Sequence, residues 1–413
     1  MKSLISLIVI FSSYIFFTVS TLVGYEYVGA ESSSSYIIYS MTIFILGILL
    51  FLYDSLRKKH RYKKNELLVL TIPFLMASSY LLSVLTDSII WSGTTRFLYF
   101  ILWGVPSILM GIYLSRNNRI DQIGKYIEII MLIFSISITV STIDSLIYGG
   151  RFSIAGGTYQ AGGYISAFAF GLNLYYLLYG NNHKRFKFTT NKYYFILCLV
   201  ILPVQIIGVF TSGARGAMVL VIAYLLIITS STVKTMKLSQ LIKYVVLLIG
   251  TAIVAFISLP NLLEIPTFNS SFNRVFSYIS TDGIDWSGTS NRDIVYSKAL
   301  DLVFESPLLG YGIFGMWKAF EAYPHNIFLE VLMQGGIVYF SIFIFIITLA
   351  LKKLFYIIKI NPKCRIIFIL SIYPIIMLLF SGTYINNSLF WFSLSFIFSY
   401  NPPISNKRKL NIK

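Results

Sequence analysis

The sequence is poor in charge, in cysteine and in acidic residues. Only 12% of its 413 residues are Asp, Glu, Lys or Arg, whereas a soluble domain carries about 25%, so the polar surface of a soluble protein is missing. This shortage excludes a soluble enzyme and, despite the formal net charge of +17, a nucleic-acid-binding protein. The two cysteines, Cys198 in an apolar run and Cys364 in a basic loop, predict neither a disulfide framework nor a zinc site.

Long hydrophobic runs take the place of polar surface. Hydrophobic residues make up 56% of the chain and gather in runs of about 20, the length that crosses about 30 Å of hydrocarbon. We therefore expect an all-α polytopic membrane protein, with one integral membrane domain over residues 1–413 and a first run that is retained rather than cleaved as a signal peptide. The twelve expected spans are 4–23, 36–53, 67–86, 97–115, 124–147, 162–180, 193–211, 216–230, 241–259, 327–350, 366–381 and 388–400.

The basic residues alternate between successive connections. With a cytoplasmic N-terminus, 26 of the 33 Lys and Arg residues fall in cytoplasmic segments, as the positive-inside rule requires. We therefore expect a multi-pass protein of the cytoplasmic (inner) membrane with both termini in the cytoplasm. A basic loop such as Arg57–Lys64 is interpreted as an orientation signal rather than as a lipid-headgroup or nucleic-acid site.

One connection is much longer than the others. Residues 260–325 join the ninth and tenth expected spans and are predicted to form a large extracytoplasmic loop. Loops of more than about 12–15 residues are usually functional or disordered, and aromatic residues such as Trp286 and Trp317 favour order here. We expect any chemistry on this face.

Arg215 is one of the few basic residues predicted to lie outside. It stands between two spans beside Gly213 and Gly216, and these glycines permit a tight turn and the close approach of a ligand. A turn needs glycine but does not need arginine. Arg215 is therefore interpreted as a ligand of a phosphate group on a membrane-embedded substrate, with a lipid-phosphate anchor as the alternative.

Arg292 is a second outward arginine. Ser290 and Asp293 have the spacing of a capping box, and Pro307 marks the end of the helix that follows. We predict an amphipathic helix on the outer membrane surface, with Arg292 in its first turn as part of an anion site or, alternatively, in a salt bridge to Asp293. Its expected apolar face consists of Ile294, Val295, Ala299, Leu300, Val303 and Phe304.

His325 is the only histidine predicted to lie outside. His60 and His183 stand among lysines in expected cytoplasmic loops and are predicted to be solvated. His325 is the chain's best outward general base, because the pKa of histidine lies near neutrality, and Glu330 about one helical turn later is expected to orient it. A purely structural histidine is the alternative.

Two other patterns carry no chemistry. Residues 310–315 read Gly-Tyr-Gly-Ile-Phe-Gly, but a dinucleotide site needs a strand before this motif and a βαβ unit around it, which an all-α membrane protein lacks. The outward His and the scattered acids have no metal-ligand spacing, so neither a metal site nor a cofactor is expected.

The order of the motifs resembles the O-antigen ligase/polymerase superfamily of bacterial membrane glycosyltransferases. The resemblance runs from about Arg151 to Gly336, and the flanking spans match only in hydropathy and number. It rests on a Ser-Gly-Ala-Arg-Gly turn at 212–216, Asn-Arg-Asp at 291–293, Glu-Ser-Pro-Leu-Leu-Gly-Tyr-Gly at 305–312, His-Asn-Ile-Phe-Leu-Glu at 325–330, and Gly-Gly at 335–336.

The resemblance implies a GT-C-like architecture and a role for each matched residue. Arg215 and Arg292 would hold the pyrophosphate of an undecaprenyl-linked oligosaccharide, and His325 would activate the acceptor hydroxyl. Arg151 resembles a further loop arginine, although Tyr-Gln-Ala-Gly-Gly at 159–163 replaces the Pro-Asn that often follows in the family. The other residues expected to contact substrate are Arg274, Tyr323, Asn326 and Glu330.

Three functions are consistent with these motifs. The favoured one is an O-antigen or surface polysaccharide polymerase that joins lipid-linked repeat units, with membrane lipids and a chain-length regulator as partners. The first alternative is an O-antigen ligase that transfers the glycan to a lipid A core. A transporter or flippase of lipid-linked glycans is the second alternative, and it would place its charges near the bilayer midplane.

Overall fold

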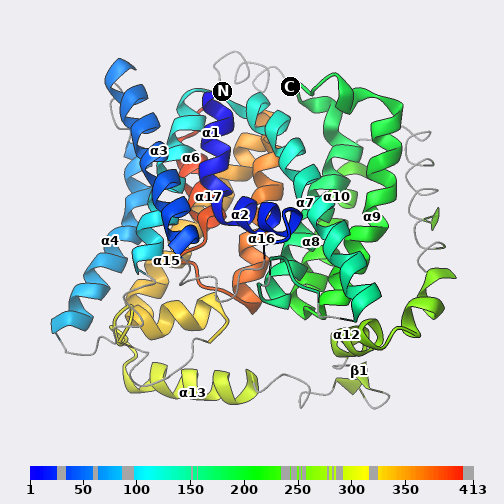
Figure 1. Cartoon of the computed structure of the whole chain (residues 1–413). Coiled ribbons are helices and arrows are strands. Elements are labelled where there is room, and N and C mark those ends of the chain that lie inside the picture. Colours follow the sequence, from blue (N-terminus) through cyan, green and yellow to red (C-terminus); the bar gives the residue numbers. More distant parts are fainter. Residues whose placement is uncertain are drawn as a thin grey trace. The chain divides into compact units, whose positions relative to one another are not determined.

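Helices make up almost all of the chain that the computed structural model describes, namely residues 1–25, 34–58, 64–85, 97–149, 152–155, 157–233, 242, 249–250, 253, 257–276, 279–280, 283–284, 292–315 and 324–402 (Figure 1). Within these residues a single two-residue strand pair, β1 (Ile279–Ser280) and β2 (Gly283–Ile284), is antiparallel. The expected all-helical class is therefore confirmed in its main feature.

The helices follow the hydrophobic runs closely. The α-helices are α1 (Lys2–Ile10), α2 (Ser12–Leu22), α3 (Ser34–Lys58), α4 (Lys64–Leu85), α6 (Val105–Arg116), α7 (Ile120–Tyr148), α8 (Tyr159–Tyr179), α9 (Lys192–Ser212), α10 (Arg215–Val233), α12 (Pro266–Phe276), α13 (Arg292–Glu305), α15 (Ile327–Ile360), α16 (Arg365–Phe380) and α17 (Ser388–Ser399). A π-helical turn η1 (Phe100–Gly104) precedes α6, and short 3-10 turns η2 (Gly180–Asn182), η3 (Phe188–Thr190) and η5 (Pro362–Cys364) lie in connections.

The number of spans expected from the sequence is not confirmed. Among the described residues, seven helices are long and apolar enough to cross a membrane, or eight if a bent pair counts as one span. That pair is α1 and α2, which meet at 86°, so the expected first span 4–23 is not one straight helix. Both α10 and α17 are apolar but short, and most of the expected span 241–259 lies outside the described residues.

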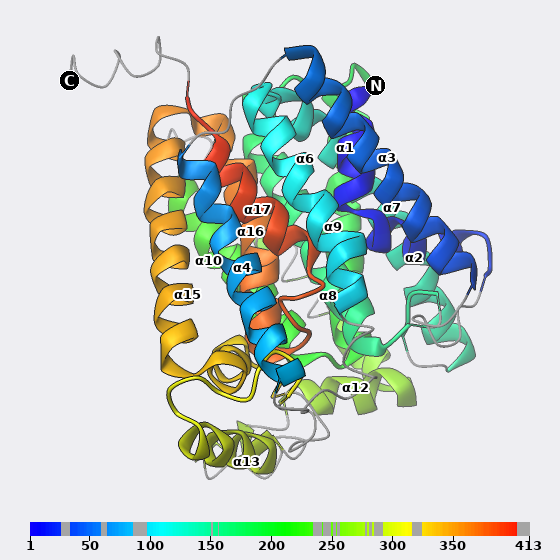
Figure 2. The same ribbon diagram turned by 90° about the vertical axis from the view of Figure 1, so that its left-hand side faces the viewer.

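The chain divides into two compact units, which are described separately. Unit 1 comprises Met1–Ser12, Ile38–Ile123 and Trp286–Lys413, and unit 2 comprises Ser13–Ile37 and Gly124–Asp285. In unit 1, α17 packs against α4, α6, α15 and α16 (Figure 2), and each of its residues is buried. A helix of only 12 residues is therefore the centre of this unit.

The basic connections of unit 1 meet at one end of its helices. Arg116 Nε, at the end of α6, donates to Glu66 at the start of α4 (2.8 Å), and Lys363 Nζ in the α15–α16 connection donates to Asp121 (2.8 Å). The opposite end brings together the start of α15, the end of α16 and the start of α17. This separation agrees with the alternating charge pattern of the sequence.

In unit 2, α8 packs closely against α9 and α10. A Cβ at Gly163 would lie 2.3 Å from Ser212 Oγ, and one at Gly171 would lie 2.3 Å from the Tyr224 ring, so these glycines allow the helices to approach. Polar side chains also join α9 to α7, since Gln205 Nε2 donates to Ser135 Oγ (2.8 Å).

The prediction that His183 is solvated is wrong. The side chain is buried, and its Nε2 is 2.8 Å from the Tyr175 hydroxyl. Gly124 makes room for the ring, since a Cβ there would lie 2.5 Å from it. The lysines around His183 in the sequence gave no sign of this contact.

Candidate functional site

The turn that carries Arg215 is built by local backbone geometry. Helix α9 ends at Ser212, Gly213 has φ of +65°, and α10 begins at Arg215. The amide of Ala214 donates to Ser212 Oγ (3.2 Å), so the serine closes the turn. The tight turn expected from the sequence is therefore present, and it places Arg215 at the positive end of the α10 dipole.

Arg215 and Arg274 lie together in unit 2. Arg215 Nε donates to the Arg274 carbonyl (2.9 Å). The Arg274 guanidinium stacks on the Tyr159 ring, with Cζ 4.4 Å from the centroid, and also donates to the Tyr159 hydroxyl. Arg274 belongs to α12, which lies across the end of α9 (Figure 1). Two arginines far apart in sequence are thus joined through the Arg215 side chain and the Arg274 backbone.

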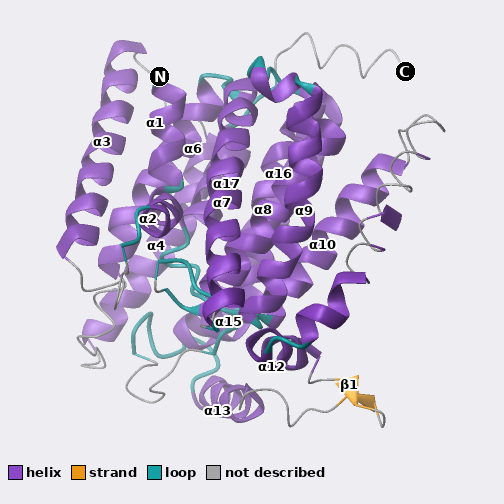
Figure 3. Cartoon of the chain, turned by 45° about the vertical axis from the view of Figure 1, so that its right-hand side comes forward, coloured by secondary structure: helices purple, strands orange, loops and turns teal. Residues whose placement is uncertain are grey.

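Arg292 opens α13, as the sequence predicts, and this helix ends at Glu305, before Pro307. The guanidinium Nη2 donates to the Phe380 carbonyl at the end of α16 (2.9 Å). The axis of α13 lies across that of α15 (Figure 3), with Ala299 and Leu302 packed on Met333. The proposed capping residue Ser290 lies outside the described residues.

The residues of the expected apolar face of α13 have two different environments, and the placement of this helix on the membrane surface stays a prediction. Val295, Ala299 and Val303 do pack towards α15, but Ile294, Leu300 and Phe304 are exposed. The packed face is rotated to include Leu302, which the prediction did not contain. The helix is apolar around most of its circumference, so periodicity alone did not select the buried side.

His325 has a backbone conformation that is uncommon for a non-glycine residue. Its φ is +52°, a left-handed value that costs a non-glycine residue about 1–2 kcal/mol. The residue is partly exposed, although its Nδ1 atom is shielded from solvent. Strained residues persist where surrounding structure holds them and concentrate at functional sites. Among the described non-glycine residues, Asn118 and Ala155 also have a positive φ, so the strain marks His325 as one of three such positions.

The two neighbours of His325 in the motif have separate structural tasks. Asn326 caps α15, since its Oδ1 accepts from the amides of Phe328 (2.9 Å) and Leu329 (3.3 Å). Glu330 is buried, and its Oε1 accepts from the Thr383 hydroxyl and from Gln334 Nε2 (3.2 Å). The expected orientation of His325 by Glu330 stays a prediction.

The connection between α16 and α17 links two of the predicted site residues. Its first anchor is the Phe380 carbonyl, which binds Arg292, and three residues later Thr383 donates to Glu330. Gly382 between them has φ of +72°. Sequence reasoning missed this segment, although a Ser-Gly-Thr run between two apolar helices was a usable signal.

The long motif at 305–312 closes a break in α15. At Gly335 and Gly336 the backbone leaves helical geometry, so the carbonyls of Met333 and Gln334 lose their helical partners. They accept instead from the amides of Tyr311 and Gly312, both at 2.9 Å. In return, the amides after the break donate to the motif: Ile337 to the Pro307 carbonyl (2.8 Å) and Val338 to the Leu308 carbonyl (3.4 Å).

The glycines of the G-x-G-x-x-G pattern therefore have a packing role. A Cβ at Gly310 would lie 2.6 Å from the Met333 carbonyl oxygen, and one at Gly312 would lie 1.8 Å from Ser83 Oγ. Beside them, Tyr311 donates to Glu305 (2.6 Å), and partial burial together with this carboxylate raises the pKa of Tyr311 to about 12. The hydroxyl thus stays protonated and attaches Tyr311 to the last residue of α13.

The predicted site residues are distributed over both units. Arg215 and Arg274 belong to unit 2, whereas Arg292, His325 and Glu330 belong to unit 1. Their convergence on one outward cavity stays a prediction. Arg151 and Tyr323 lie outside the described residues, as do Trp286 and Trp317. In the described part of the chain, no group of three or more His, Cys, Asp or Glu could hold a metal ion.

Comparison with known proteins agrees with the motif order. Residues 198–344 match the sequence model of the family described as O-antigen ligase. This match confirms, for that part of the chain, the resemblance to the O-antigen ligase/polymerase superfamily. No curated protein and no solved structure matches the chain. The matched stretch contains Arg215, Arg274, Arg292, His325 and Glu330.

Proposed function

We propose that this chain is a membrane glycosyltransferase that joins undecaprenyl-pyrophosphate-linked oligosaccharide repeat units into an O-antigen or related surface polysaccharide. The observation that carries the proposal is the family match over residues 198–344, which contains the two arginine positions and the strained histidine. We place the reaction on the outer face of the cytoplasmic membrane, because these residues belong to segments that carry few of the chain's basic residues.

In this proposal the arginines bind the donor. A pyrophosphate leaves more easily when its developing charge is neutralised, and arginine donors fit phosphate oxygens closely. Arg215 supplies one guanidinium at a helix N-terminus, where the dipole also favours an anion, and Arg274 lies beside it. Arg292 supplies a third, held by the end of α16.

His325 acts as the general base on the acceptor. It takes the proton of a sugar hydroxyl, whose oxygen forms a bond to the anomeric carbon of the donor as the bond from that carbon to the pyrophosphate oxygen breaks. The electron pair of the broken bond leaves with undecaprenyl pyrophosphate. In-line attack inverts the anomeric centre.

Ligase activity is the second candidate, because the matched family carries that description. The two activities use the same donor and differ only in the acceptor. A polymerase transfers the glycan to another lipid-linked repeat unit, whereas a ligase transfers it to a lipid A core. The pyrophosphate site therefore serves both.

The test is deletion of the gene in its native host, followed by electrophoresis of the surface polysaccharide. The deletion strain is complemented with wild type, His325→Ala or His325→Asn. Asparagine tolerates positive φ better than other residues do, so His325→Asn keeps the backbone conformation while it removes the base. An immunoblot of the membrane fraction confirms equal amounts of each variant.

We expect single-repeat surface glycan in the deletion strain and a full ladder only with wild type. If neither His325 variant restores the ladder, the loss of activity is due to the missing imidazole rather than to a changed backbone conformation. Accumulation of long lipid-linked polymer, with no glycan on lipid A, would assign the ligase reaction instead. An unchanged ladder in the deletion strain would refute both activities.

A further inference from the structure

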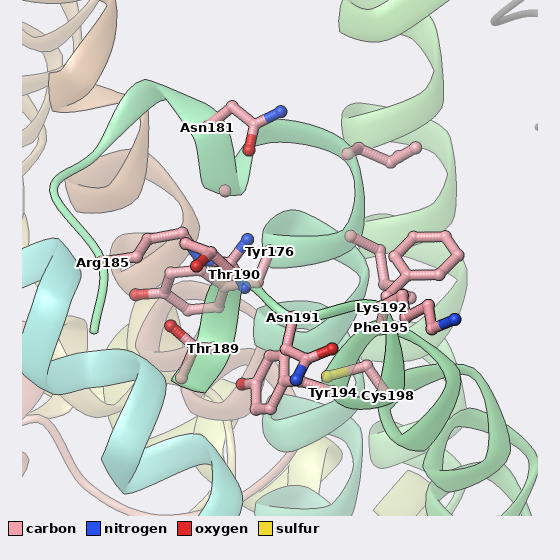
Figure 4. Close-up of a pocket in the computed structure, with 13 residues that line it drawn as sticks. Tyr176, Asn181, Arg185, Thr189, Thr190, Asn191, Lys192, Tyr194, Phe195 and Cys198 are labelled. Carbon is pink, nitrogen blue, oxygen red and sulfur yellow. The ribbon is translucent and has the colours of Figure 1, made fainter. Parts of the chain in front are cut away.

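A cavity of about 310 Å³ lies in unit 2 where α8 passes into α9 (Figure 4). Residues at the start of α9 line this cavity, and the Arg215 turn follows the end of the same helix. The two sites are therefore at opposite ends of α9. The polar side chains that line the cavity include Asn181, Arg185, Asn191, Lys192 and Tyr194. Its end of the unit carries the basic residues that we predict to face the cytoplasm.

The wall of the cavity is held by a buried ion pair. Arg185 Nε lies 3.0 and 3.2 Å from the two carboxylate oxygens of Glu128, which is fully buried. The guanidinium also lies over the Tyr194 ring, with Cζ 5.6 Å from the centroid. Because Glu128 cancels the charge of Arg185, the net positive charge of the cavity lining comes from Lys192.

The groups that face the cavity favour an anion. Lys192 is the first residue of α9, where the helix dipole is positive, and its side chain is exposed. Asn191 uses its Oδ1 to cap α9, accepting from the Tyr193 amide (3.2 Å), so its side-chain NH2 is the group left to donate. The Lys192 ammonium and the Asn191 side-chain NH2 can therefore each donate to an oxygen of a phosphate group.

The surface next to the cavity is apolar and exposed. Tyr193, Phe195, Ile196 and Leu197 in the first turns of α9 are all exposed, and Phe195 itself lines the cavity. A free phosphate ion would gain nothing from such a surface, whereas the acyl chains of a lipid would cover it. Basic pockets at the cytoplasmic ends of membrane helices are suited to anionic headgroups.

We propose that this cavity binds the headgroup of an anionic phospholipid, with its phosphate beside Lys192 and its acyl chains along the exposed apolar face of α9. The site is separate from the residues assigned to the glycosyltransferase reaction and does not depend on that function. Its occupant would stabilise the α8–α9 connection from the cytoplasmic side.

The test measures lipid binding to the full chain, purified in detergent and delipidated, by native mass spectrometry. Phosphatidylglycerol is compared with phosphatidylcholine of the same acyl chains. We expect wild type to prefer phosphatidylglycerol. We expect Lys192→Ala to reduce that binding about fivefold, the factor that one cation at an anionic membrane surface contributes.

Lys359→Ala is the matched control, because Lys359 is an exposed lysine in the last turn of α15, far along the chain from this cavity. It should leave the preference unchanged. Thr190→Trp, at an exposed lining residue, should reduce binding by filling the cavity without removing charge. Equal binding of both lipids, or equal loss in Lys192→Ala and Lys359→Ala, would overturn the proposal. Displacement of phosphatidylglycerol by equimolar inorganic phosphate would show a soluble-anion site and would also overturn it.

Discussion

Gly336 in unit 1 and Gly213 in unit 2 both have positive φ, 58° and 65°, and both interrupt apolar helical stretches. At Gly213 the interruption is closed locally, because its amide donates to the Phe210 carbonyl and Ser212 caps the next residue. At Gly336 the backbone groups are satisfied by Pro307–Gly312, a segment of the connection that precedes α15. The same residue type thus serves a local turn in one unit and a long-range docking contact in the other.

The space around the two glycines differs in the same way. A Cβ at Gly336 would lie 2.3 Å from the Leu308 backbone, whereas one at Gly213 would meet nothing nearer than 3.4 Å. A break in an apolar helix is costly in a membrane unless each freed amide and carbonyl finds a partner. Unit 1 meets this requirement only when the 305–312 motif is docked.

The largest expected effect tests this difference directly. Gly336→Ala should destabilise the protein by the left-handed backbone cost of about 1–2 kcal/mol plus an overpacking cost of about 1–3 kcal/mol. Gly213→Ala should carry only the backbone cost. The measurement is the thermal unfolding temperature of each full-length variant in the same detergent, followed by tryptophan fluorescence. If the unfolding temperature falls equally in the two variants, the proposed difference in packing around Gly336 and Gly213 is wrong.

An intermediate effect compares the buried polar groups of the units. In unit 1 the Thr383 hydroxyl donates to the Glu330 carboxyl group, while in unit 2 the Ser166 hydroxyl donates to the Gln205 carbonyl (2.7 Å). Thr383→Val should cost about 1.5–3 kcal/mol, as for bonds to charged groups, and Ser166→Ala about 0.5–1.5 kcal/mol. Unfolding in increasing denaturant would rank them, and a larger loss for Ser166→Ala would contradict the assignment.

The smallest expected effect concerns the arginine pair of unit 2. Tyr159→Phe removes the hydroxyl that accepts from Arg274 but keeps the ring below the guanidinium. Tyr159→Leu removes both and loses a further cation–π energy of about 0.5–1 kcal/mol. The apparent KM for the lipid-linked donor, measured in reconstituted membranes, should rise slightly for Phe and more for Leu. If the KM is the same in wild type and both variants, Tyr159 does not contribute to donor binding.

Much of the helical arrangement follows from the sequence alone. Apolar runs of membrane-spanning length demand helices, because a backbone in hydrocarbon must satisfy its own hydrogen bonds. For this reason α3, α4, α7, α9 and α15 coincide closely with the predicted spans. The start of α13 at Arg292 and its end before Pro307 followed from local signals in the same way.

Long-range partners had no such local signal. The contact of Arg215 with Arg274, the burial of His183 beside Tyr175 and the attachment of Glu330 to Thr383 join residues whose sequence neighbours do not identify the partner. The buried face of α13 was missed because its apolar residues surround most of the helix. Periodicity selects a face only when the other face is polar.

The sequence by itself determined that this is a helical membrane protein, which loops carry its positive charge, and the order of motifs that the family match contains. The length of an apolar run and the charge of a loop are properties of single segments. They can therefore be read from each segment without knowing what it contacts. Only the tertiary structure decided that the 305–312 motif closes the break at Gly336, that His325 is held at positive φ and that the α16–α17 connection joins Arg292 to Glu330. Those features depend on which backbone groups meet across the fold, and no single segment specifies its own partner.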